Sequence, residues 1–146
     1  MRLCSSSRQP AHKGQVMDIS GIDPHTSTLH LKLPGSSEKI GLALELQSLT
    51  SDACQKVVEE NQAAYAEARE KHGEIPKETY EEGGLKLYAA TIVGWTWEKD
   101  ASWGGEQLKF TKANVMKVLS KDFILRQVTE AANEQKRFFA KYAKGS

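Results

Sequence analysis

The chain has 146 residues, of which 39% are hydrophobic and 27% charged, and its formal net charge is +1. That length suits one domain, and the near-neutral charge argues against a dedicated nucleic-acid binder, whose affinity comes from a basic excess. No apolar run approaches the ~18 residues of a membrane span, and two cysteines are too few for a disulfide scaffold or a four-cysteine zinc site.

The first sixteen residues differ in composition from the rest. They contain three basic residues, no acidic residue and almost no apolar side chain, so they cannot bury enough surface to offset the entropy of ordering. We expect a disordered leader over residues 1–16 and a single domain over residues 17–146, which carries a net charge of −2. The leader lacks the apolar stretch of a signal peptide, so a cytoplasmic location is expected.

The clearest local pattern lies between residues 27 and 46. Apolar and polar residues alternate on both sides of a Pro34–Ser37 turn, which predicts an antiparallel β-hairpin with one apolar face. The apolar positions are Leu29, Leu31, Leu33, Ile40, Leu42, Leu44 and Leu46. An isolated hairpin is marginally stable, so this face must cover helices of the same chain or a partner.

Four helices are predicted after the hairpin, over about residues 52–72, 77–93, 112–119 and 123–142. Thr50, Ser51 and Asp52 offer N-caps for the first helix, and Gly73 ends it. The second helix has a weak point at Gly83-Gly84, and it is predicted to extend to residue 93 because Ile92 and Trp95 continue its apolar spacing. The resulting fold class is α+β, with a hairpin packed against about four helices.

Nothing in the sequence is arranged for catalysis or for binding a metal or cofactor. The four histidines are scattered, no nucleophile or phosphate-binding motif is present, and the many glutamates follow the spacing of a solvated helix face. Cys54 lies near a predicted helix N-terminus without an identifiable partner and is interpreted as a core residue. We therefore expect a protein that is not an enzyme, with no catalytic, cofactor or metal site.

Aromatic residues and the hairpin are the best candidates for partner contacts. Trp95, Trp97 and Trp103 lie within nine residues, and they either wedge a loop onto the helices or anchor a partner, since aromatics dominate interface hot spots. An edge strand over Ser27–Leu33 would also offer backbone groups to another chain. The candidate partner-binding residues are Trp97, Trp103, Leu29, Leu31, Phe139 and Tyr142.

The order of these segments resembles a known family. A helix leading to Val93-Gly94-Trp95 is followed by a glycine-rich loop, by Phe110-Thr111 with Asn114, and by a last segment ending in Phe138-Phe139. Over about residues 17–139 the chain resembles the tail assembly chaperones of long-tailed bacteriophages and prophages. The resemblance implies a non-enzymatic protein that keeps the tape-measure protein soluble while tail-tube subunits assemble.

Two alternatives to the chaperone interpretation stay open. The chain could be a tail component that remains in the virion, or a cytoplasmic regulatory or nucleic-acid-binding adaptor. For the chaperone interpretation we expect the tape-measure protein, and a tail-tube protein beside it, as partners. No nucleic acid and no membrane are expected, and self-association into a homo-oligomer is left open.

Overall fold

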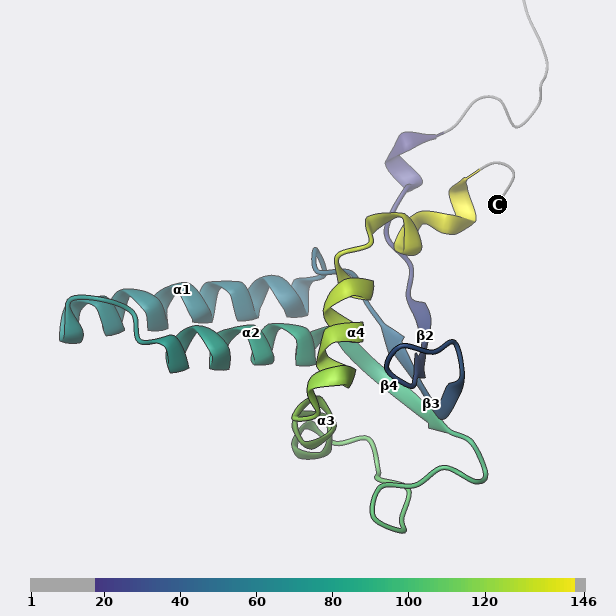
Figure 1. The fold of residues 1–146 in the computed structure, drawn as a ribbon. Coiled ribbons are helices and arrows are strands. Elements are labelled where there is room, and N and C mark those ends of the chain that lie inside the picture. The colour runs from purple at the N-terminus through teal and green to yellow at the C-terminus, as the bar shows by residue number, and fades with distance from the viewer. Residues whose placement is uncertain (1–17, 144–146) are drawn as a thin grey trace, which may run out of the picture.

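A computed structural model describes residues 18–143, which form an α+β fold (Figure 1). Three antiparallel strands form one sheet in the order β2-β3-β4, and helices cover one of its faces. The strands are β2 (Ser27–Lys32), β3 (Lys39–Leu46) and β4 (Ile92–Trp97). The helices are α1 (Asp52–His72), α2 (Lys77–Thr91), α3 (Lys112–Leu119) and α4 (Asp122–Ala132), with the 3₁₀ helices η1 (Ile19–Gly21) and η2 (Gln135–Tyr142). The expected leader over residues 1–16 lies outside the described residues.

The predicted hairpin is formed by β2 and β3. Its apolar side chains face the helices, and Leu31, Leu44 and Leu46 are fully buried. Gly41 has a φ of +93° where three residues of β3 oppose Leu31 of β2, and this bulge needs a residue without a Cβ. Leu33 departs from the prediction, because β2 ends at Lys32 and leaves the Leu33 side chain 43% exposed.

The third strand, β4, corrects the sequence prediction for residues 92–97. The second helix ends at Thr91 and not at about residue 93, and Ile92 and Trp95 lie on a strand paired with β3. Trp95 and Trp97 lie opposite Leu44 and Leu42 on the helix-covered face. β-Branched and aromatic residues suit this pleated surface, and pairing with β3 outweighs the helical spacing of the segment.

The last predicted helix is divided in two. α4 ends at Ala132, Asn133 and Glu134 interrupt it, and residues 135–142 continue as η2. The Asn133 side chain donates to Thr129 O, 2.8 Å away, and such local bonds compete with helix continuation. The break turns η2 back toward β2, so that Phe138 becomes fully buried.

α1 and α2 form a two-helix arm that projects from the sheet (Figure 1). Both begin where the sequence predicts: the Ser51 hydroxyl caps α1 by accepting from Cys54 N–H at 3.3 Å, and Gly73 ends α1 in the left-handed conformation. Along all of α1 only Cys54 is buried. α1 therefore packs mainly on α2, and the arm is joined to the core through α2.

The hydrophobic core lies between the helix-covered face of the sheet and the three helices α2, α3 and α4 with η2. Its buried members are Leu31, Leu42, Leu44, Leu46, Ile92, Leu108, Val115, Val118, Leu119, Ile124, Val128, Ala131 and Phe138. Between residues 18 and 143, no helix combines the length and apolar character needed to cross a membrane.

Candidate protein-binding groove

A groove of about 780 Å³ runs between the outer edge of β2 and helix α4. One wall is formed by β2 and the turn after it, and the other by α4 and the start of η2. The side chains and backbone that line it belong to Leu29, His30, Lys32, Leu33, Pro34, Gly35, Ser36, Asp122, Phe123, Arg126, Gln127, Glu130, Ala131, Glu134 and Arg137. This volume is in the range of sites that bind a ligand or a short chain segment.

β2 is an edge strand, and side chains occupy its outward backbone groups at two points. The Gln127 amide accepts from Lys32 N–H at 2.9 Å and donates to Lys32 C=O at 2.9 Å, as a neighbouring strand would. Four residues away, the Arg137 guanidinium donates to Thr28 C=O at 3.3 Å. Both contacts protect the strand edge from indiscriminate pairing.

His30 lies between these two protected points. In an extended strand, alternate residues direct their backbone groups to the same side, so the N–H and C=O of His30 point outward like those of Thr28 and Lys32. Outside the β2–β3 ladder, no hydrogen bond among residues 18–143 reaches these two groups of His30. The groove therefore exposes one donor and one acceptor of a strand edge beside apolar side chains.

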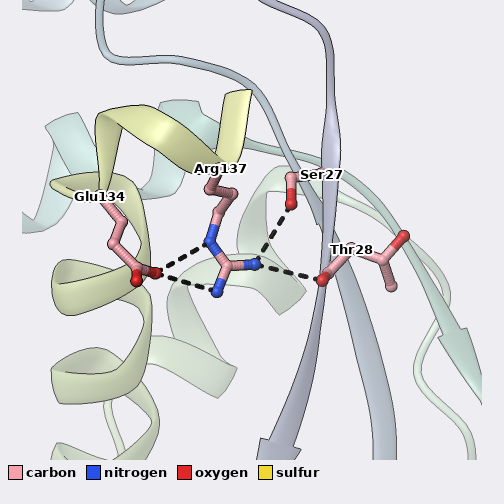
Figure 2. Close-up of polar contacts among 4 residues, drawn as sticks. All are labelled: Ser27, Thr28, Glu134 and Arg137. Atoms are coloured by element: carbon pink, nitrogen blue, oxygen red, sulfur yellow. Dashed lines mark hydrogen bonds and ion pairs between the residues drawn. The ribbon is translucent and has the colours of Figure 1, made fainter. Parts of the chain in front are cut away.

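Arg137 fixes one end of the groove (Figure 2). Its Nε and Nη2 donate to Glu134 Oε1 at 3.3 and 3.2 Å, while Nη1 reaches Ser27 Oγ at 3.2 Å and the carbonyl of Thr28. The side chain is only 23% exposed. The guanidinium thus fastens the start of η2 to β2 and sets the separation of the two walls.

The groove carries no net charge. Three basic side chains, Lys32, Arg126 and Arg137, face three acidic ones, Asp122, Glu130 and Glu134. Two of the possible pairs are formed, with Arg126 at 2.8 Å from Asp122 and Arg137 at 3.2 Å from Glu134. The choice of a partner by this groove therefore depends on shape, apolar contact and backbone hydrogen bonding.

The six candidate residues from the sequence do not form one site. Leu29 lines the groove and is half-buried, whereas Leu31 is fully buried, so its side chain is available only to the core. Phe139 and Tyr142 lie on η2, where the Tyr142 hydroxyl accepts from Asp23 N–H at 3.2 Å and donates to Asp23 C=O at 3.0 Å. Tyr142 therefore holds the segment before β2 against η2, whereas Phe139 packs against the core.

Trp97 is the last residue of β4, on the opposite edge of the sheet, and Trp103 lies in the loop after it. Both are half-buried against the core. The indole N–H groups of Trp95 and Trp97 both donate to Leu108 C=O, at 3.0 and 3.1 Å. Trp103 pairs with Glu106 through backbone bonds of 2.7 and 3.4 Å in a small loop. Two indoles are therefore used to hold the loop after β4.

Sequence reasoning missed Gln127 and Arg137, which shape the groove. Gln127 lies four residues from Phe123 and four from Ala131, a spacing that puts all three on one side of a helix. A glutamine between two apolar residues on the same side of a helix indicates a polar contact next to the core, and this pattern could have been read from the sequence. For Arg137 the fold is needed, because the break at Asn133 decides which way it points.

Other chemical features of the described residues are few. Across residues 18–143 there is no group of three or more His, Cys, Asp or Glu side chains that could hold a metal ion. Burial raises the pKa of the Cys54 thiol above its ordinary value, against a smaller lowering by a hydrogen bond with Ser51.

Comparison with protein-family models, with curated proteins and with solved structures gives no significant match.

Proposed function

We propose that this protein is a non-enzymatic phage tail assembly protein that binds an extended segment of the tape-measure protein in the groove between β2 and α4. The observation that carries the proposal is the outward N–H and C=O of His30, which no hydrogen bond among residues 18–143 reaches outside the β2–β3 ladder, on an edge strand that faces a helix across a groove. A strand edge opposite a helix is a recurrent way of binding extended peptides, in which backbone bonds give affinity and side-chain pockets give specificity.

The apolar side chains of the groove support the same partner chemistry. Leu29 is half-buried, and Leu33 is 43% exposed at the end of the strand. A segment added next to β2 would place alternate side chains toward Leu29 and Phe123 and the others toward solvent. The resemblance to tail assembly chaperones supplies the identity of the partner. Binding of the tape-measure protein would take place in the host cytoplasm.

The test compares substitutions at two equally exposed apolar residues, one directly after β2 and one on β4. Leu33, 43% exposed, lines the groove, whereas Val93, 41% exposed, lies on β4 outside it. An otherwise insoluble fragment of the tape-measure protein from the same gene cluster is co-expressed with wild type, Leu33→Lys or Val93→Lys. The soluble complex is then quantified by size-exclusion chromatography.

Wild type and Val93→Lys are expected to keep the fragment soluble, and Leu33→Lys to weaken the complex about tenfold, because losing an interface anchor costs more than about 1 kcal/mol. Circular dichroism should show both variants folded, since both side chains are exposed. Failure of the wild type to solubilise the fragment would remove the chaperone proposal. If the fragment became insoluble with Val93→Lys and stayed soluble with Leu33→Lys, the binding site would have to lie on β4.

A further inference from the structure

The two-helix arm, residues 52–91, presents most of its surface to solvent. α1 is 21 residues long, about 31 Å at 1.5 Å per residue, and among the helices and strands its main packing partner is α2. The arm projects away from α3 and α4, so its tip lies far from the rest of the described chain (Figure 1). A rigid projection of this kind can reach a second molecule.

The arm is acidic. It contains nine Asp or Glu residues against five Lys or Arg residues, a net charge of −4. Three of the acids are paired along the helices, with Lys71–Glu67, Lys77–Glu81 and Lys86–Glu82 at 3.4 to 3.8 Å. The exposed carboxylates with no ion-pair partner between residues 18 and 143 are Asp52, Glu59, Glu60, Glu70, Glu74 and Glu78.

The opposite charge is gathered on α3 and its flanks. Residues 107–121 contain four lysines and no acidic residue, a net charge of +4. The four are exposed and form no ion pair within the part of the chain that the structure describes: Lys109, Lys112, Lys117 and Lys121. Phe110 lies among them and is 43% exposed. Its ring packs edge-on against that of Trp95, with 5.3 Å between the ring centroids.

We propose that the acidic arm of one copy docks on this lysine segment of a second copy. The net charges of the two surfaces are equal and opposite, and every copy brings both. The tip of the arm, where α1 ends and α2 begins, lies away from α3 of its own chain (Figure 1). Glu70 and Glu74 belong to this tip, so their pairing with the lysine segment has to be between molecules. Contact between two different surfaces repeats head to tail, giving rings or open chains.

Two double substitutions separate the two surfaces. Glu70→Lys with Glu74→Lys makes the arm neutral and places cations near the C-terminus of α1, where they are favourable. Lys109→Glu with Lys112→Glu makes the lysine segment neutral and places an anion in the first turn of α3, which is also favourable. Lys39→Glu with Lys99→Glu is the matched control, because both lysines are exposed and lie outside the two surfaces.

Sedimentation velocity at low ionic strength tests the proposal. The wild type and the control variant are expected to show a sedimentation coefficient that rises with protein concentration. This rise should disappear at about 0.5 M salt, since ions then screen charges beyond a few ångströms. Each surface variant alone is expected to be monomeric, whereas an equimolar mixture of the two should form a heterodimer that grows no further, because only one complementary pair of surfaces remains.

Three results would overturn the proposal. The first is a wild type that stays monomeric at every concentration and salt. The second is self-association that persists in both surface variants or in high salt. The third is a wild type that stays monomeric while binding a 20-nucleotide single-stranded DNA probe that the Lys109→Glu, Lys112→Glu variant no longer binds, which would make the lysine segment a nucleic-acid surface.

Discussion

Gly83 lies in the interior of α2, where a glycine normally weakens a helix relative to alanine. Here it allows close packing, because a Cβ at this position would collide with the Tyr65 hydroxyl and lie 3.1 Å from Asn61 Cγ of α1. The Asn61 side chain also donates to Gly83 C=O at 2.9 Å. This glycine therefore sets the distance between the two helices of the arm.

Gly83→Ala is expected to lower the free energy of unfolding by about 1–3 kcal/mol through overpacking. Gly84→Ala is the matched control, because no atom lies within 4 Å of its Cβ position, and it should raise stability by about 0.5–1 kcal/mol. Urea denaturation measures both. Equal effects at the two positions would mean that the helices of the arm are not in contact at Gly83.

Cys54 links stability to pH in the alkaline range. Burial raises its pKa in the folded protein above the ordinary value of 9.0, so the folded state holds the thiol proton more tightly than the unfolded chain. Stability from this group is complete below the unfolded pKa and is lost as pH rises from the unfolded pKa to the raised pKa of the folded state. Cys54→Ala removes this contribution, so the stability difference between wild type and variant should shrink toward pH 10. A difference constant across that range would contradict the burial of the thiol.

At the scale of elements, η2 depends on Arg137 for its position. Removing the guanidinium leaves Thr28 C=O and the Glu134 carboxylate without their partner (Figure 2). Arg137→Met should therefore cost about 1–3 kcal/mol of stability, since hydrogen bonds to charged groups are stronger than neutral ones. Lys136→Met, at the exposed neighbouring position, should stay within about 0.5 kcal/mol. Chemical denaturation of the two variants measures the loss of stability in each. Equal losses would show that η2 is held by Phe138 alone.

Elements with local signals were predictable and elements that depend on distant contacts were not. α1 begins at the capping Ser51 and ends before Gly73, and both hairpin strands follow from their alternation. The helical spacing of Ile92 extends the second predicted helix to about residue 93, whereas pairing with β3, about 50 residues earlier, decides that Ile92–Trp97 is a strand. The break after Ala132 was missed for a similar reason, since burial of Phe138 next to the sheet favours the turn.

At the scale of the whole molecule, the groove exists because β2 and α4 meet across 95 residues of sequence, as the Gln127–Lys32 bonds show. The sequence predicted an edge strand in Ser27–Leu33, which the sheet order bears out. It did not predict that side chains of α4 and η2 would cover part of that edge and leave His30 open. The site could not be located without the packing of the helices on the sheet.

Amide hydrogen exchange at His30 tests the binding mode most directly. If an extended segment of the tape-measure protein pairs with β2, the His30 N–H gains an acceptor, and its exchange should slow about tenfold or more in the complex. Backbone amides of residues 93–97 on the opposite edge of the sheet should be unaffected. Unchanged exchange at His30, with slowing at Trp95 or Phe110 in its place, would contradict binding in the groove.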